Sequence, residues 1–453
     1  MKKYENNAGV HVPEILLPNK EVDLAKWAVV ACDQYTSQPE YWNTTERIVG
    51  EDSSTLRLML PEMYLDKPDE ADRIKAINAT MDKYVQEGIL ENKGQGLVLL
   101  RRSVAGNTRL GLVMALDLEC YDYNKGATTL IRATEGTIVE RIPPRLRIRE
   151  NAPLEMPHII VLIDDPQKTV IEPLMANAAD LEQVYDFELM QNGGHIEGWF
   201  INSEKTIDSV VKAIEALGNP DKFHETYGQD KAPMIFAMGD GNHSFATAKA
   251  NWEKVKATLI PEEAANHPAR FALIELENVH DDGIIFEPIH RVLFNVGKPM
   301  KFLSRLLTVI SEQNGCGCKA NLQGLTSKAA LDKKIAKMRE TAKGHILPIC
   351  TKLGYGYIYV DEPKAQLEVG TLQAALDVVL KETEGTTIDY IHGDDVVDKL
   401  GREKGNMGFW LPPMDKSDLF KTVVFDGALP RKTFSMGEAN EKRYYLECKG
   451  IKN

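Results

Sequence analysis

The sequence predicts a mixed α/β (α+β) fold with a mixed sheet, flanking helices and a helix-rich C-terminal part. Helical and extended patterns alternate over the first part of the chain, a strand–loop–helix junction lies at residues 232–249, and helical patterns dominate after Gly297. With 453 residues the chain is long enough for two or three domains. We expect a mixed α/β core at residues 1–297 and a helix-rich part at residues 298–453, which can also complete the same unit.

The individual elements follow from the spacing of apolar residues. Helical spacing predicts helices at residues 39–49, about 69–90, near 169–190, 203–218, 301–313, 327–342 and 370–383. Apolar runs predict extended segments at residues 96–102, 108–119, 157–165, 270–278 and 288–294. A Gly-Asn pair at residues 106–107 joins the first two of these and predicts a hairpin.

Composition limits the classes of function. The formal net charge is −13 and the pI is near 5.4, which disfavours non-specific attraction to nucleic acid or to an anionic membrane. No secretory signal or membrane span is recognisable, so we expect a cytoplasmic protein. The close pair Cys316 and Cys318 lacks a second pair at zinc-site spacing, and we expect reduced, structural thiols.

The junction at residues 232–249, APMIFAMGDGNHSFATAK, is the strongest functional candidate. An apolar run ends at a polar loop, and a helical pattern follows at once. The loop consists of Gly239, Asp240, Gly241, Asn242, His243 and Ser244. Glycines let the backbone approach a ligand closely, and the first amides of a helix favour an anion. This pattern predicts a phosphate-binding loop, and ordinary helix capping is the alternative.

Four further segments carry candidate side chains. An apolar run that ends at Asp33 predicts a strand, and a helix begins soon after it with Pro39. If this strand lies beside the strand that ends at Met238, the loops after the two strands open at one edge of the sheet. An arginine guanidinium can donate two parallel hydrogen bonds to the oxygens of a phosphate. One region of this acidic chain is rich in arginine. That region, residues 130–150, contains Arg132, Thr134, Glu135, Thr137, Arg141, Arg145, Arg147 and Arg149.

Arg132 and Glu135 are the stronger candidates of that region, because the later arginines alternate with apolar residues and fit the outward face of a strand. A solvated face with surface ion pairs is the alternative for the whole cluster. Arg291 interrupts an apolar run, and Lys432 with Ser435 lies in a polar late segment, residues 428–447. That segment either closes over a bound anion or forms a charged surface helix.

Several separated motifs resemble the domain-of-unknown-function 1015 family. They are DGNHSFATA at 240–248, ACDQYTS at 31–37, ATEGT at 133–137, PIHR at 288–291 and PRKTFSMGEANEKRYYLE at 430–447. The resemblance implies a core similar to those of ParB chromosome-partitioning proteins and sulfiredoxin, with a loop that cradles nucleotide phosphates as in ParB-like free serine kinases. Many relatives carry DGHHR at this loop, whereas this chain has Asn242 and Ser244, so Arg132 or Arg291 is expected to supply the missing guanidinium.

The family resemblance and the polar residues together predict phosphoryl transfer between a nucleotide, ADP or ATP, and serine or O-phosphoserine. The serine assignment follows from the PRKTFSMGEA ending, which resembles proteins encoded beside phosphoserine-pathway enzymes. We expect Asp240 to bind Mg²⁺ or to orient the nucleophile. His243 or Glu135 is expected to exchange the hydroxyl proton, and Asp33 is a further candidate for the general base. Arg141, Arg291 and Lys432 are expected to supply positive charge.

The direction of transfer stays open among a kinase, a phosphatase and a phosphoserine:nucleoside-diphosphate phosphotransferase. A ParB-like nucleotide-dependent DNA-binding or regulatory protein is the alternative class, which the charge of −13 disfavours. A homodimer is expected only because such assemblies are common.

Overall fold

The chain divides into two units in the computed structural model. The structure describes residues 4–124, 126–156, 158–315 and 318–452, with the backbone alone at 318–324. The first unit comprises Met1–Ile285 and Met436–Asn453, and the second comprises Phe286–Ser435. The expected boundary at residue 297 lies inside the second unit, and the last residues of the chain belong to the first.

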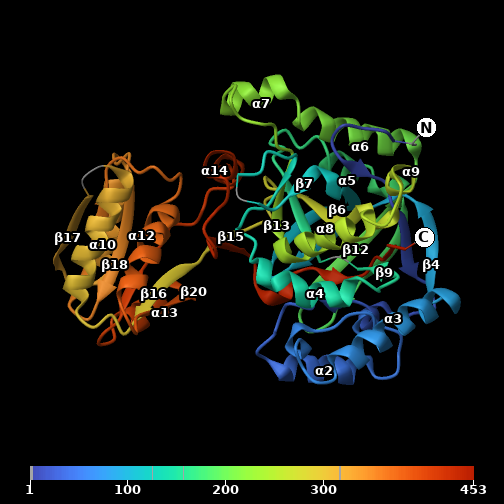
Figure 1. Cartoon of the computed structure of the whole chain (residues 1–453), viewed down its shortest axis with the longest axis horizontal. Coiled ribbons are helices and arrows are strands. Elements are labelled where there is room, and N and C mark those ends of the chain that lie inside the picture. The colour runs from blue at the N-terminus through green and yellow to red at the C-terminus, as the bar shows by residue number, and fades with distance from the viewer. Residues whose placement is uncertain (1–3, 125, 157, 316–317, 453) are drawn as a thin grey trace. The chain divides into compact units, whose positions relative to one another are not determined.

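A ten-stranded mixed sheet forms the centre of the first unit (Figure 1). Its order is β11 (Glu182–Leu189), β12 (Gly194–Ile201), β5 (Leu97–Val104), β6 (Asn107–Asp117), β14 (Phe271–Asn278), β10 (Ile160–Ile163), β13 (Phe236–Asp240), β8 (Ile131–Arg132) and β7 (Tyr121–Asp122), with β1 (Val10–His11) on β6. The β10–β14, β13–β8 and β7–β8 pairs are parallel, and the other pairs are antiparallel. The mixed α/β prediction and the predicted β5–β6 hairpin are confirmed.

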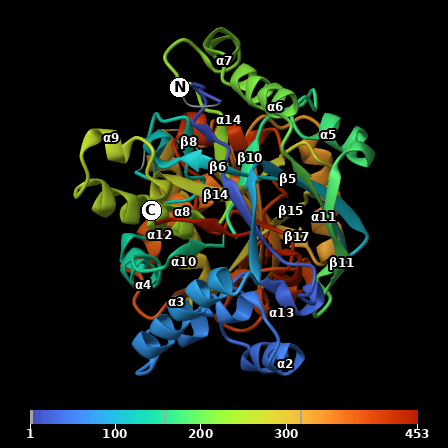
Figure 2. The same cartoon turned by 90° about the vertical axis from the view of Figure 1, so that its right-hand side faces the viewer.

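Both faces of this sheet are covered, which explains the unbroken apolar run in β5. Leu97 and Leu99 pack into a core with α6 (Glu204–Leu217) and α8 (Asn242–Lys256) on one face. Val98 and Leu100 pack into a second core with α2 (Pro39–Val49) and α3 (Glu70–Gln86) on the other. Successive side chains of a strand point to opposite faces, so each face receives alternate residues. Figure 2 shows α2 and α3 together beneath the sheet.

The long helix expected near residues 169–190 is wrong. The segment holds one short helix, α5 (Glu172–Ala176), and the edge strand β11. Val184, Tyr185 and Phe187 are β-branched or aromatic residues that fit a pleated surface, and pairing with β12 overrides the local helical spacing. The predicted helices at 39–49, 69–90 and 203–218 are confirmed as α2, α3 and α6, with shifts of a few residues at their ends.

The arginine-rich segment forms a helix, α4 (Ile142–Arg149), and the strand expected there is wrong. Pro143 and Pro144 lie in its first turn, where their fixed φ angle is favourable and their missing N–H groups cost nothing. Helix α4 packs against α8 (Figures 1 and 2). The surface-helix alternative for residues 428–447 is also wrong, because that segment contains β22 (Phe434–Met436), a 3₁₀ turn at Ala439–Glu441 and β23 (Tyr444–Tyr445).

The last residues of the chain contribute two short strands to the first unit. Strand β23 pairs with β3 (Val29–Val30), and β24 (Lys449–Gly450) pairs with β9 (Leu154–Glu155). The strand before Asp33 therefore lies in a separate two-stranded sheet and not beside β13, so the condition for a shared sheet edge is not met. A partner more than 400 residues away in the chain leaves no local signal near residue 30.

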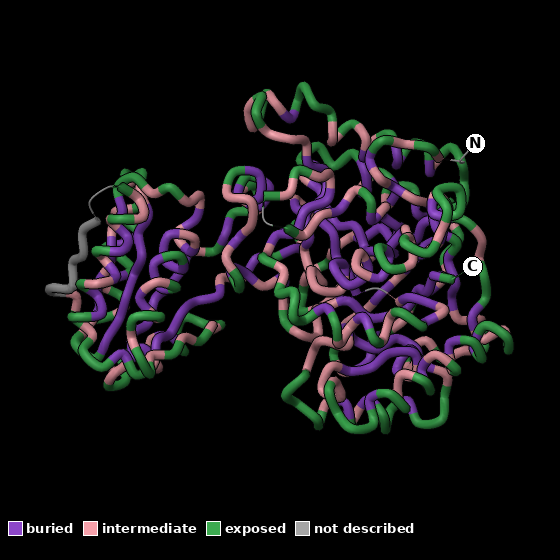
Figure 3. The backbone as a smooth tube through the Cα atoms, in the orientation of Figure 1, coloured by how far each residue is buried: buried purple, intermediate pink, exposed green. Residues whose placement is uncertain are grey.

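The second unit combines the expected helices with a sheet of its own. Helices α10 (Pro299–Asn314), α11 (Lys328–Arg339) and α12 (Glu368–Glu382) confirm the three helical predictions, and α13 (Asp394–Gly401) and α14 (Asp418–Asp426) follow. The six-stranded sheet has the order β17 (Cys318–Leu325), β19 (Gly354–Val360), β18 (His345–Thr351), β21 (Met407–Phe409), β16 (His290–Phe294) and β20 (Thr387–Ile391). In Figure 3 the central strands of each unit are largely buried and the outer turns of the helices are exposed.

Two further sequence expectations concern the thiols and membrane spans. Cys32, Cys120, Cys350 and Cys448 are free thiols, as expected, while Cys316 and the side chain of Cys318 lie outside the described residues. Among the described residues, the helices lack the combination of length and apolarity that spanning a bilayer requires.

Candidate functional site

The glycine loop joins β13 to α8, as the strand–loop–helix prediction requires. Gly241 stands between the two elements with a φ of 79°, a left-handed conformation that favours glycine. A Cβ atom at this position would lie 3.1 Å from the Cα atom of Ile159, so both the backbone angle and the packing select glycine. The backbone thus turns sharply at Gly241 and enters α8.

The first turn of α8 presents backbone N–H groups. Asn242, His243 and Ser244 occupy this turn, where an α-helix leaves its donors without intrahelical partners. Gly241, the N-cap residue, has no side chain to cap these groups. Gly239 lacks the left-handed backbone angle of Gly241. A Cβ atom at Gly239 would meet Leu162 and Met436 at 3.0 Å, so close packing favours glycine there. The first turn of α8 therefore has the donor pattern of an anion-binding helix N-terminus.

Asp240 is an ionised carboxylate that is paired with a lysine. Its Oδ1 atom accepts a hydrogen bond from the Gly241 N–H at 2.9 Å, and its Oδ2 atom lies 3.3 Å from Nζ of Lys442. Burial acts to raise the pKa of Asp240, but Lys442 and His158 outweigh it, so the pKa lies below its ordinary value. Lys442 was not a sequence candidate, because its proximity arises from the return of the C-terminal segment.

Thr134 and Asn242 brace the loop against the segment after β8. The Thr134 N–H donates to Oδ1 of Asn242 at 3.3 Å, and Nδ2 of Asn242 donates to the Thr134 hydroxyl at 3.4 Å. The same hydroxyl donates to the Met238 carbonyl at 2.7 Å. Both side chains are therefore engaged with each other and with the loop, which is a positioning role.

His243 is a neutral imidazole in a cationic environment. Its Nε2 atom accepts a hydrogen bond from the Ile138 N–H at 3.3 Å, which places the ring proton on Nδ1. Burial, Arg145 and Arg141 together lower its pKa to about 4, although Asp33 acts in the opposite direction. Arg141 and Arg145 thus act electrostatically on His243, while a contact between Arg141 and a phosphate stays a prediction.

His158 is a site residue that the sequence analysis missed. Its Nδ1 atom lies 2.7 Å from the Tyr445 hydroxyl, and its Nε2 atom lies 3.0 Å from the Ser244 hydroxyl. The Asp33 carboxylate lies 3.9 Å from Nε2, so Asp33 approaches the loop although β3 does not join the main sheet. The available signal is the polar histidine at the start of the apolar run HIIVLI.

A cavity of about 150 Å³ borders this histidine. Its lining combines polar side chains with apolar side chains of α3, α4 and the segment after α2. Its polar lining residues include Cys32, Glu62, Arg145, His158, Ser244 and Tyr445. Arg145 forms an ion pair with Glu62, and burial raises the pKa of Glu62 although Arg145 lowers it. Of the residues in the first turn of α8, Ser244 lines this cavity.

Some expected residues have other partners. Arg132 is buried and donates to the carbonyls of Thr129, Ala232 and Pro233, which fixes the backbone before β13. Glu135 and Thr137 are half-buried in the segment between Thr134 and Ile138, both of which contact the loop.

Three expected phosphate-binding residues belong to the second unit. They are Arg291, Lys432 and Ser435. Arg291 is fully buried there and donates to Oε1 of Gln373 at 2.9 Å and to the Ile289 carbonyl at 2.7 Å. Its guanidinium therefore stabilises the second unit. In the first unit, Arg147 and Arg149 are held in ion pairs with Glu70 and Glu155.

The expected Mg²⁺ site does not fit Asp240. The ammonium group of Lys442 already lies against this carboxylate, and burial of the pair favours a fixed cation of the chain. Among the described residues, the groups of three adjacent ligand side chains do not include Asp240. Lys442 therefore places a positive charge beside Asp240.

These observations define a mixed α/β protein whose candidate site lies where β13 ends and α8 begins. The chain belongs to the family described as "Protein of unknown function (DUF1015)", whose model matches residues 16–379. No match is found among curated proteins.

Three solved structures match about three quarters of this chain at low identity. A free serine kinase in complex with AMP has a TM-score of 0.36 and 10% identity, covering 75% of this chain and 91% of that one. A conserved hypothetical protein from Pyrococcus furiosus has a TM-score of 0.33 and 10% identity, covering 75% and 95%. SbnI with a C-terminal truncation, from Staphylococcus aureus, has a TM-score of 0.33 and 9% identity, covering 74% and 82%.

Proposed function

We propose that the protein is a phosphotransferase that moves a phosphoryl group between a nucleotide and serine or O-phosphoserine at the N-terminus of α8. The observation that carries the proposal is the first turn of α8, entered through Gly241 and bordered by a cavity and by Lys442, Arg141 and Arg145. Phosphoryl transfer depends chiefly on positioning and on charge stabilisation, which amides and fixed cations supply.

The size of the cavity supports a small acceptor. Pockets for drug-sized ligands span about 300–1,000 Å³, so a cavity of about 150 Å³ suits an amino acid better than a whole nucleotide. The nucleotide phosphates would then meet the amides of 242–244. The choice of serine rests on the family resemblance of the PRKTFSMGEA ending.

His158, oriented by Tyr445 and close to Asp33, is the best-placed proton acceptor. In the kinase direction the substrate hydroxyl oxygen bonds to phosphorus, the nucleotide oxygen leaves, and the hydroxyl proton passes to His158 or Asp33. His243 suits this role less well, because its pKa near 4 makes it a weak base and its Nε2 atom already accepts a hydrogen bond. Glu135, in the segment between Thr134 and Ile138, is a second candidate.

The ³¹P NMR spectrum of reaction mixtures tests the proposal. Serine or O-phosphoserine is incubated with ADP, ATP or no nucleotide, with and without magnesium, which also resolves the direction of transfer. We expect turnover by the wild-type protein and at least a 100-fold loss in His158→Ala, as expected when a general base is removed, with similar losses in Asp240→Asn.

The matched control is His280→Ala, which removes a histidine paired with Asp164 outside the site and should retain activity. Absence of turnover in every mixture contradicts the proposal. If salt-sensitive retardation of DNA accompanies that absence, the ParB-like alternative takes its place.

A further inference from the structure

Four chemistry-bearing side chains share one face of the β11–β12 hairpin, apart from the site at α8. Asp186 lies opposite Glu197 in the strand register, and Glu188 lies opposite His195. Residues two apart on a strand point to the same face. The four side chains therefore form a two-by-two group that the hairpin itself positions.

Both ring nitrogens of His195 face carboxylates. Nε2 lies 3.0 Å from Oδ1 of Asp186, and Nδ1 lies 2.9 Å from Oε1 of Glu188. A neutral imidazole carries one N–H, so it can donate to only one of these carboxylates. If Nδ1–H donates to Glu188, then Nε2 presents a lone pair beside the Asp186 carboxylate. A cation bound between Nε2 and this carboxylate interacts favourably with both groups.

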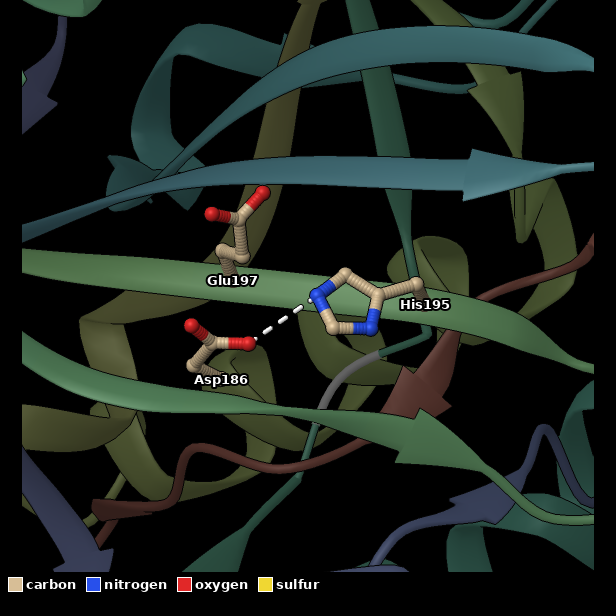
Figure 4. Close-up of side chains that lie close together, drawn as sticks. All are labelled: Asp186, His195 and Glu197. Carbon is tan, nitrogen blue, oxygen red and sulfur yellow. Dashed lines mark ion pairs between the residues drawn. The ribbon is translucent and has the colours of Figure 1, made fainter.

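Asp186, His195 and Glu197 place one ligand atom each within 4.8 Å of one another. Figure 4 shows these three side chains close together. We infer that these three residues bind a divalent transition-metal ion, with Zn²⁺ the best-suited probe. One imidazole and two carboxylates match the nitrogen and oxygen ligands of zinc, with room for water at the open position. Glu188 holds the imidazole through Nδ1, the usual partner of a metal-bound histidine.

Arg101 is compatible with this site. Its guanidinium donates to both oxygens of Glu197, at 2.6 and 2.8 Å. A carboxylate offers about four lone-pair positions, so Glu197 can accept from Arg101 and still bind a metal. The three carboxylates of the group outnumber this one guanidinium, which leaves two negative charges to offset a dication.

The site is open to solvent. The His195 side chain is 36% exposed and that of Asp186 is 50% exposed, while Glu197 is 15% exposed. An ion can therefore enter without any movement of the sheet, and water can complete its coordination. The partly buried Glu197 anchors the site on the side of β5.

Calorimetric titration of the full chain with ZnCl₂, after treatment with a chelator, tests this inference. We expect one Zn²⁺ per chain that the wild type and His280→Ala bind equally. His280 pairs with a single carboxylate, Asp164, and is the matched control. His195→Ala should lose this binding event, and Glu188→Gln should weaken it by about 10–100-fold.

Every variant retains all six cysteines, so any zinc bound by thiols is the same in each variant. Differences in zinc binding between the variants therefore report on the β11–β12 hairpin. Circular dichroism establishes that each variant is folded, and Glu188→Gln preserves side-chain shape if His195→Ala is unstable. Equal zinc binding by the wild type, His195→Ala and Glu188→Gln overturns the inference. The inference is also overturned if the wild type binds no more zinc than His195→Ala and Glu188→Gln bind.

Discussion

Gly241 sets the direction of the first turn of α8, and the polar side chains around it depend on that turn. The loop residues are consecutive in the chain, so the sequence could group Asp240, His243 and Ser244 and predict their strand–loop–helix setting. His158 and Lys442 come from segments far away in the chain, and only the folded sheet brings them to the loop. Arg132 was misleading, because a buried guanidinium can serve backbone carbonyls as well as a ligand.

Gly241→Ala should cost about 1–2 kcal/mol in the free energy of unfolding, because an alanine is strained in the left-handed region. It should also weaken nucleotide binding, because a Cβ atom would press on Ile159 and shift the first turn. Gly106→Ala is the matched control, since its φ is 83° and a Cβ atom there meets nothing within 4 Å. Urea unfolding and calorimetric titration with ADP measure both effects. Equal ADP affinity in the two variants would contradict this role of Gly241.

His243 should make stability depend on pH between its unfolded pKa of 6.5 and its folded pKa of about 4. The folded state lowers this pKa, so the contribution is complete above pH 6.5 and is lost as the pH falls through 4. After allowance for partial exposure of the loop, we expect about 1–2 kcal/mol. Denaturant unfolding of the wild type and His243→Gln at several pH values measures this difference. Parallel pH profiles of the two proteins would rule out the lowered pKa.

The C-terminal segment is the element that completes the proposed site. It carries Lys442 to Asp240 and Tyr445 to His158, and β23 anchors it to β3. Helices such as α2 and α3 could be predicted because their apolar residues repeat with a helical period. The β23–β3 pairing could not, since a two-residue strand has no pattern of its own. Strand β11 was missed because pairing, and not local spacing, determines its conformation.

Arg443 holds this segment through ion pairs with Glu275 and Glu447, and all three side chains are at most 2% exposed. Arg443→Met should destabilise the first unit by about 3–5 kcal/mol, because two carboxylates lose their buried partner. Arg147→Met, which breaks ion pairs of a half-exposed guanidinium on α4, should cost about 1 kcal/mol or less. Urea unfolding followed by tryptophan fluorescence compares the variants. Similar losses in both would mean that Arg443 does not hold the segment.

At the scale of the whole molecule, the second unit is an insertion between Ile285 and Met436 of the first. It has its own six-stranded sheet and a core that includes Leu331, Ile346 and Tyr355. The mixed α/β class could be predicted from the alternation of patterns along the chain. The return of residues 436–453 to the first unit could not, because composition does not change at residue 436.

Because its core is internal, a fragment of residues 286–435 should fold without the rest of the chain. We expect a cooperative thermal transition by circular dichroism and no affinity for ADP, since the proposed loop lies in the first unit. A fragment that remains unfolded, or that binds ADP as tightly as the full chain, would contradict this division of roles.

Amide hydrogen exchange of the full chain, measured with and without ADP and O-phosphoserine, tests most directly whether the first turn of α8 seats a phosphoryl group. The account predicts that ligand slows exchange at residues 242–245 and leaves the surface helix α11 unchanged. Unaltered exchange at residues 242–245 under saturating ligand, with protection elsewhere, would contradict it.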